Sequence, residues 1–155
     1  ARGLRRSSVL IRDLSTAGAM PALEMTMRFA GARQKLLAHN IANIQTPNFV
    51  ARDVEPGSFQ RMLGEAIDKR REANAGTSGA LDWEPTRDIR RGARPGSIEL
   101  EPLEAHGGVL GHDRNAADLE RLMQDMVENA SAYRVAADLY RQQKSTLTTA
   151  ISQRP

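Results

Sequence analysis

The feature that most constrains the fold is a long apolar repeat near the end of the 155-residue chain. Apolar or aromatic residues recur there at alternating steps of four and three residues, at nine of ten positions. The ten positions are Leu119, Met123, Met126, Ala130, Tyr133, Ala137, Tyr140, Lys144, Leu147 and Ile151. No proline or glycine interrupts this stretch before Pro155. We therefore predict one helix over about 116–152, with a narrow seam of the coiled-coil type.

A second stretch near the N-terminus follows the same steps. Its positions are Leu23, Met27, Ala30, Gln34, Leu37, Ile41 and Ile44. Pro21 suits the first turn of a helix, and Thr46-Pro47 ends one, because the residue before a proline is pushed out of the α region. Each seam needs a partner. The fold class we predict is mainly α, with long N- and C-terminal amphipathic helices that pair as an antiparallel, coiled-coil-like hairpin.

The chain between the two seams has less regular patterning and many glycines and prolines. A short helix is expected over 59–72, a flexible loop over 73–79 and a short strand over 97–101. Trp83 should have a small local cluster around it. We expect such an insert to bury little on its own.

Four parts of the chain follow from these patterns. They are a flexible basic arm over 1–19, the N-terminal helix and its turn over 20–54, a variable insert over 55–113 and the C-terminal helix over 114–155.

Charge is uneven along the chain. Residues 1–52 hold eight Lys or Arg and two Asp or Glu, so this part could attract nucleic acid, an anionic membrane or an acidic protein. An Arg-rich helical hairpin that binds nucleic acid is therefore an alternative, although aromatic residues hardly interleave with the basic ones. No apolar run approaches the roughly 20 residues of a membrane span. The apolar stretch near the start is too short for a cleavable signal peptide, so we expect none, and no direct membrane insertion.

Residues suited to catalysis are few. The absence of cysteine excludes disulfides, zinc thiolates and cysteine nucleophiles. His106 and His112 lie in a glycine-rich stretch beside Asp113, too little for a metal site, and His39 is expected to be solvated or interfacial. There is no phosphate-binding loop, nucleophile elbow or HExxH motif. The sequence predicts no enzyme, no metal and no cofactor.

Segment 40–49 combines more helix-ending and turn-forming residues than an ordinary helix end needs. Asn40 and Asn43 lie about one turn apart, so their amides can bond to a neighbouring chain or back to the helix end. Asn48 tolerates a left-handed backbone conformation, and Phe49 can fold back onto the helix. The candidate site residues of this segment are Asn40, Ala42, Asn43, Thr46, Pro47, Asn48 and Phe49.

This segment resembles the N-terminal signature of flagellar rod and hook proteins, roughly N-x-A-N-x-x-T-P-G-Y. Asn40, Ala42, Asn43, Thr46 and Pro47 match it, whereas Asn48-Phe49 replaces Gly-Tyr. Ala51-Arg52-Asp53-Val54 and the 118–134 part of the C-terminal helix are similar to the short, proximal-rod members. The resemblance covers about 20–73 and 112–152.

The resemblance implies a structural subunit of the basal body rod, which crosses the periplasm. Such a subunit is exported unfolded by the flagellar type III apparatus and assembles through its terminal helices. The implied partners are other rod subunits, the adaptor between MS ring and rod, and the export apparatus, with no nucleic acid. The terminal helices are expected to be loose in the free subunit and to pair on assembly, through Leu23, Met27, Leu37, Ile41 and Ile44 against Leu119, Met123, Met126, Tyr133, Tyr140, Leu147 and Ile151.

Overall fold

The computed structural model describes residues 4–74, 80–94, 96–105 and 114–152, with the side chains of 18–73, 80–94, 96–105 and 118–152. Three helices dominate it: α1 (Leu4–Asn43), α2 (Pro56–Asn74) and α3 (Arg114–Ser152). Four short strands complete it: β1 (Arg52–Asp53), β2 (Ile89–Arg91), β3 (Ile98–Leu100) and β4 (Leu103–Glu104). The mainly-α class is therefore confirmed.

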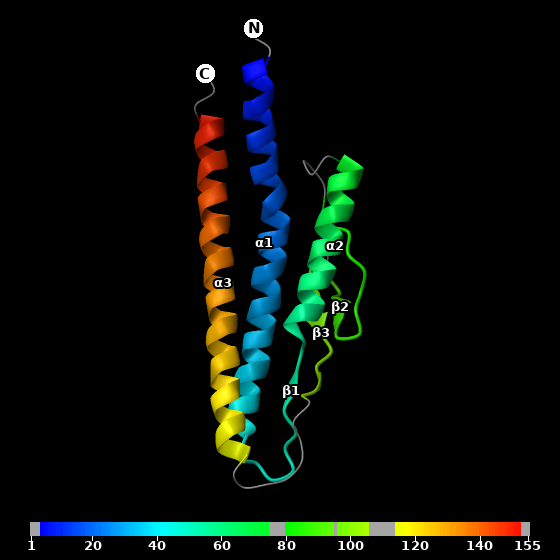
Figure 1. Ribbon diagram of the computed structural model, residues 1–155, viewed down its shortest axis with the longest axis vertical. Coiled ribbons are helices and arrows are strands. Elements are labelled where there is room, and N and C mark those ends of the chain that lie inside the picture. The colour runs from blue at the N-terminus through cyan, green and yellow to red at the C-terminus, as the bar shows by residue number, and fades with distance from the viewer. Residues whose placement is uncertain (1–3, 75–79, 95, 106–113, 153–155) are drawn as a thin grey trace.

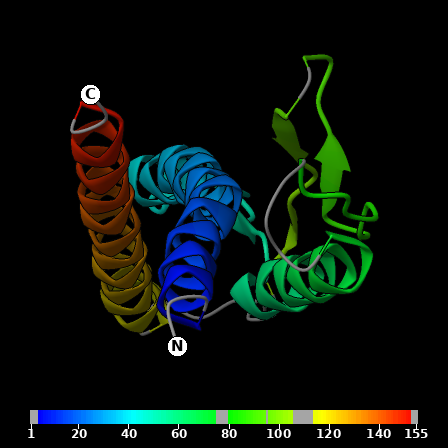
Figure 2. The same cartoon turned by 90° about the horizontal axis from the view of Figure 1, so that it is seen from above.

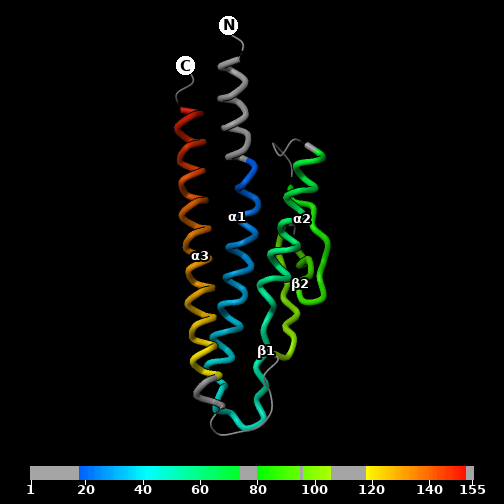
Figure 3. Tube along the Cα trace, in the orientation of Figure 1, coloured from blue at the N-terminus to red at the C-terminus, as the bar shows by residue number. Residues whose placement is uncertain are grey.

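Helix α1 lies at the centre of the molecule. Figure 2 shows α3 on one side of it, with α2 and the β2–β3 strands on the other. Helices α1 and α3 are in contact along their length and run in opposite directions, as Figure 1 shows. The Cα trace in Figure 3 shows α2 also running against the direction of α1. Coiled-coil packing between α1 and α3 stays a prediction.

The start of α1 differs from the sequence prediction. The helix begins at Leu4 instead of near residue 20, so residues 4–19 continue α1, and Pro21 lies inside it. An interior proline removes one helical hydrogen bond and disturbs the preceding turn. Nη1 of Arg70, on α2, donates to the Gly18 carbonyl at 2.6 Å and so ties α2 to this part of α1. The flexibility expected of residues 1–19 stays a prediction.

The hydrophobic core lies between α1 and the insert. Its buried members are Met25, Phe29, Val54, Phe59, Met62, Ala66, Trp83 and Ile89. The rings of Phe29 and Phe59 stack with their centroids 4.0 Å apart and their planes 5° apart. Ile89 and Val54 are completely buried. The insert therefore builds its core together with one face of α1, which supplies apolar surface through Met25 and Phe29. The expectation that the insert buries little on its own stays a prediction.

Short strands return the chain to this core. Strand β2 pairs antiparallel with β3, Ile89 opposite Leu100, and β1 pairs antiparallel with β4, Arg52 opposite Glu104. The strand predicted at 97–101 corresponds to β3. Strands β1 and β4 have two residues each, too few for a pattern, and the residues of β2, Ile89–Arg91, do not alternate between apolar and polar. Most of the predicted 73–79 loop lies outside the described residues.

The beginning of α2 is held by a buried carboxylate from the β2 side. Asp88 is 4% exposed and accepts hydrogen bonds from the Ser58 hydroxyl at 2.9 Å and the Glu55 amide at 3.2 Å. The Thr86 hydroxyl donates to it at 2.7 Å. A carboxylate at a helix N-terminus satisfies open N–H groups and favours the positive end of the helix dipole. This contact explains why α2 starts at Pro56, three residues before the prediction.

The α3 half of the predicted seam is partly wrong. Met123, Tyr133 and Ile151 are 56%, 44% and 73% exposed. The most buried α3 side chains are instead Leu122, Asn129 and Ala136, seven residues apart, while Leu119, Met126, Tyr140 and Leu147 are half-buried. Each of these three buried residues lies one position before a predicted seam residue. The prediction followed the most apolar row of the helix, whereas the buried row includes the polar Asn129. On α1, Leu37 is completely buried, and Leu23, Met27, Ile41 and Ile44 are half-buried.

Asn129 is the polar residue that the apolar pattern missed. Its Nδ2 donates to the Ala30 carbonyl at 2.8 Å and to the Gln34 Oε1 at 2.7 Å, so it ties α3 to one level of α1. A buried asparagine between paired helices specifies their register.

We expect Asn129→Ala to lower the free energy of unfolding by about 1 kcal/mol, because the bond to α1 is lost without a substitute. Ser131→Ala is the matched control: its hydroxyl donates only within α3, to the Val127 carbonyl, and the residue is exposed. The measurement is urea unfolding followed by circular dichroism. Equal midpoints for the two variants would contradict the assignment.

An exposed ion cluster joins α2 to the chain before β2. Lys69 Nζ lies 2.5 Å from Asp82, and Arg91 lies 3.0 Å from it. Hydrogen bonds from Lys69 and then Arg91, followed by the charge of Lys69, lower the pKa of Asp82 below its ordinary 3.8. The stabilisation is therefore present above pH 3.8 and is lost as the pH falls through the lower pKa of the folded chain.

A carboxyl-detected NMR titration should place the pKa of Asp82 below 3.8 in the native chain. Lys69→Met should move it upward, because the first-ranked donor is gone, whereas Lys35→Met, at an exposed lysine of α1, should not. An Asp82 pKa that Lys69→Met leaves unchanged would show that the contact is not formed in solution.

Candidate assembly site

The end of α1 and the strand that follows it are joined by Asn40. This side chain is 1% exposed. Its Nδ2 donates to the Arg52 carbonyl at 2.6 Å, and its Oδ1 accepts from the Arg52 amide at 3.3 Å. The carboxamide thus pairs with both backbone groups of one β1 residue, as a neighbouring strand would. The sequence suggested that the Asn40 amide bonds to a neighbouring chain or back to the helix end. It bonds instead to strand β1 of the same chain.

An ion pair two turns earlier on α1 holds the same strand. Nε of Arg33 lies 3.0 Å from Oδ1 of Asp53, and Nη2 lies 2.5 Å from Oδ2. The Arg33 side chain is 7% exposed and that of Asp53 is 21% exposed. Asp53 Oδ1 also accepts from the Val54 amide at 2.8 Å. A bidentate pair of this kind fixes both the position and the direction of β1 on α1.

The turn between α1 and β1 spans residues 43–49. Backbone hydrogen bonds run from the Thr46 amide to the Asn43 carbonyl at 2.9 Å and from the Phe49 amide to the Thr46 carbonyl at 3.1 Å. Asn48 has a φ of 61°, a left-handed conformation that asparagine tolerates better than other side-chain-bearing residues. The sequence had anticipated this conformation at Asn48.

Side chains finish the turn. Asn43 Nδ2 donates to the His39 carbonyl at 2.9 Å, back toward the helix end. The Phe49 ring meets the exposed His39 ring edge-to-face, with centroids 5.7 Å apart. Phe49 thus returns onto α1. These contacts with His39 hold the turn on the side of α1, while the residues on its outer side stay exposed.

The candidate residues of segment 40–49 divide into two groups. Asn40 is buried, and Asn43 and Phe49 are half-buried, so they shape the turn from within. The exposed ones are Ala42, Thr46, Pro47 and Asn48, together with Gln45. The sequence reading missed the partners Arg33 and Asp53, whose only signal is that Arg33 precedes Asn40 by seven residues and so lies on the same face of the helix.

A second exposed surface runs along α3. Six of the eight large hydrophobic side chains that are exposed among the described residues belong to this helix. They are Met123, Val127, Tyr133, Val135, Leu139 and Ile151. Single exposed apolar residues are ordinary on protein surfaces, but their concentration on one helix marks an interaction surface.

The described residues offer no metal centre and no membrane span. No three His, Cys, Asp or Glu side chains within these residues lie together as metal ligands would. Among the helices described, none has the length and apolarity needed to cross a bilayer. The pair His106 and His112 lies outside the described residues.

Comparison with known proteins points toward the flagellum. The chain is 27% identical over 103 residues to the flagellar basal body rod protein FlgB of Borrelia hermsii. This match covers 65% of the chain and 71% of the relative. No protein-family model matches the chain. No solved structure matches it either. The similarity to a rod protein agrees with the resemblance of segment 40–49 to the rod and hook signature.

Proposed function

We propose that this chain is a structural, non-enzymatic subunit of the flagellar basal body rod, in its proximal part. The single observation that carries the proposal is the number of large apolar side chains that α3 exposes, on more than one of its faces. An isolated helix pair leaves these side chains in water, whereas neighbouring subunits in a rod would cover them. The similarity to the rod protein FlgB of Borrelia hermsii supports the flagellar rod as this assembly.

Helices α1 and α3 differ in how they are held. One face of α1 packs against the insert through Met25 and Phe29. Helix α3 rests on α1 and buries only three side chains fully among those described, Leu122, Asn129 and Ala136. We infer that α1 and the insert form the stable unit of the free subunit, and that α3 gains its coiled-coil packing when neighbours bind. We propose that the chain is exported by the type III apparatus and then assembles through its terminal helices.

The turn 43–49 is proposed to meet adjacent subunits, including other rod proteins and the adaptor at the MS ring. Its accessible residues include Thr46, Pro47 and Asn48, and Val50 beside them is 49% exposed. The Asn40 and Arg33 contacts hold the turn rigid, so little entropy is lost when a neighbour docks.

Binding of nucleic acid has less support. Two basic residues of α1 are already engaged: Arg28 pairs with Glu24 at 2.6 Å and Arg33 with Asp53. Neutralised arginines release no counterions from phosphates.

We expect Asn43→Ala and Pro47→Ala to abolish or strongly reduce motility while the purified proteins stay soluble and helical. Each change alters the turn that presents residues to neighbours, and neither touches the core. Gln45→Ala, at an exposed position of the same turn, is the matched control and should swim normally. Normal rods with both variants would contradict this role of the turn.

The experiment that tests the proposal is deletion of the gene, followed by imaging of basal bodies. Rings without a rod, restored by the wild-type gene, are the expected result. Complete rods in the deletion strain would overturn the proposal.

A further inference from the structure

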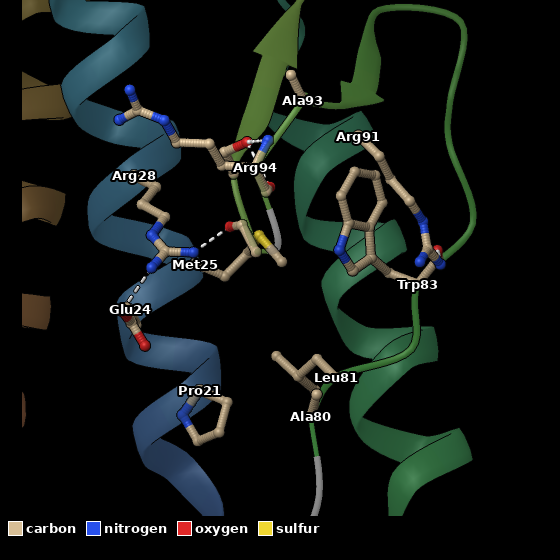
Figure 4. A pocket seen from close by; sticks show the side chains of 13 residues that line it. Pro21, Glu24, Met25, Arg28, Ala80, Leu81, Trp83, Arg91, Ala93 and Arg94 are labelled. Carbon is tan, nitrogen blue, oxygen red and sulfur yellow. Dashed lines mark hydrogen bonds and ion pairs between the residues drawn. The ribbon is translucent and has the colours of Figure 1, made fainter.

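A pocket of about 610 Å³ opens between part of α1 and the insert, beside the core that they share. Figure 4 shows Pro21, Met25 and Arg28 along the α1 wall, with Leu81 and Trp83 on the opposite wall. This volume lies within the range of pockets that accept small ligands or several side chains. The site is separate from the turn 43–49.

The pocket is basic. Three arginines, Arg28, Arg91 and Arg94, line it against one acid, Glu24. Arg28 is held by Glu24 and by the Gly96 carbonyl. Gly96 has a φ of +75°, a left-handed conformation that favours glycine, and a Cβ there would also displace the end of the Arg28 side chain, 2.6 Å away.

The other two arginines differ in their engagement. Arg91 lies over the Trp83 ring, 5.2 Å from its centroid, and also pairs with Asp82. The guanidinium of Arg94 has no hydrogen-bond or ion-pair partner among the described residues and is exposed. The pocket therefore offers apolar surface from Met25 and Leu81 and one uncompensated positive charge at Arg94, which fits an occupant that is apolar at its centre and acidic at its edge.

The first part of α3 has this character. Met123 and Val127 are 56% and 66% exposed and lie one turn apart. Residues 118–128 hold four acids and one arginine, and Glu120 and Glu128 are exposed on either side of the apolar pair. Helix α3 and the insert lie on opposite sides of α1 (Figure 2), so one chain cannot fill its own pocket with this face.

We propose that the pocket of one copy receives the Met123–Val127 face of α3 from a second copy, with Glu120 against Arg94. The inference rests on the proposed function and names surfaces for it. A contact between two different surfaces is heterologous, and such contacts build rings or open helical arrays instead of two-fold dimers. Opposite charges set the orientation of the contact, and the apolar pair supplies burial.

Charge exchange in the full chain tests the contact. Sedimentation velocity over a concentration series should show self-association of the wild type, and Arg94→Glu or Glu120→Arg alone should weaken it about tenfold, because like charges then face each other. Mixing the two variants should restore association of one with the other. Arg87→Glu, at an exposed arginine outside the pocket, is the matched control and should associate as the wild type does.

The apolar part has its own test. Val127→Ser should weaken association, whereas Leu139→Ser, at an exposed residue of α3 beyond Glu128, should not. Since the chain has no cysteine, Arg94→Cys and Glu120→Cys can be mixed, and a disulfide between the two copies is expected on oxidation.

The outcomes separate the inference from the proposed function. A wild type that stays monomeric at every concentration, or charge variants that associate as the wild type does, would overturn the pocket contact. If these variants also build normal rods in cells, the contact is wrong and the rod function stands. Association restored only in the mixture supports the contact, whether or not the chain is later found in the rod.

Discussion

Phe59→Ala lowers the free energy of unfolding of the free subunit by about 3–5 kcal/mol, the cost typical of an aromatic removed from a packed core. Phe59 is 4% exposed and stacks on Phe29 of α1, so the substitution opens a cavity where helix and insert meet. Total stabilities of about 5–15 kcal/mol leave little margin for such a loss. We expect α1 to lose helicity together with the insert. The measurement is urea unfolding monitored by circular dichroism.

Ile151→Ala is the control for this prediction. The sequence reading placed Ile151 in the seam, but it is 73% exposed, and we expect a change within about 0.5 kcal/mol. If only the pairing of the two long helices held the chain together, Ile151→Ala would destabilise it more than Phe59→Ala. Loss of stability with Ile151→Ala and none with Phe59→Ala would show that the core is not where the structure has it.

Asp53→Ala is expected to cost about 3 kcal/mol, because it leaves the buried Arg33 guanidinium without its carboxylate. The value lies at the lower end for buried pairs, since the Asp53 side chain is 21% exposed and water can enter. Strand β1 should then detach from α1. The turn 43–49 would lose its support, and motility should fall with it. Thermal unfolding and a swimming assay measure the two effects.

Two further variants test whether the unpaired Arg33 charge causes this loss of stability. Arg33→Met combined with Asp53→Asn should be much less destabilising than Asp53→Ala, because no buried charge is left unpaired. Glu55→Ala removes a carboxylate whose pair with Arg61 spans 3.8 Å and is largely exposed, so its effect should be within about 0.5 kcal/mol. A double variant as unstable as Asp53→Ala would contradict the ion-pair explanation.

The sequence predicted those parts of the fold that depend on local pattern. Helix α3 was placed within two residues of its start, because its repeat is long and lacks prolines. The left-handed Asn48 and the helix end before Pro47 follow from residue chemistry alone. These features need no knowledge of distant contacts.

The parts that the sequence did not predict depend on tertiary contacts. The rotation of the α3 seam results from Asn129, whose burial is acceptable only because Ala30 and Gln34 lie opposite. The core was missed because α1 carries two buried faces, and the one with Met25 and Phe29 is short and overlaps the other. Pro21 was assigned to a helix start, since its interior position is recognisable only from the helix around it.

The partners of Asn40 and Asp53 could not be read from spacing either. Their bonds join residues 12 and 20 positions apart, across the turn 43–49. The sequence identified the turn as unusual, and the structure supplies the reason: the strand after it is fastened to α1 by an amide and an ion pair.

The most direct test of the account is to locate the chain itself in purified hook–basal bodies. The chain should copurify with the rod, and a cryo-electron microscopy map should hold α1 and α3 side by side in density adjacent to the MS ring. The turn 43–49 should touch a neighbouring subunit there. Absence of the chain from rods that are otherwise complete would contradict the account.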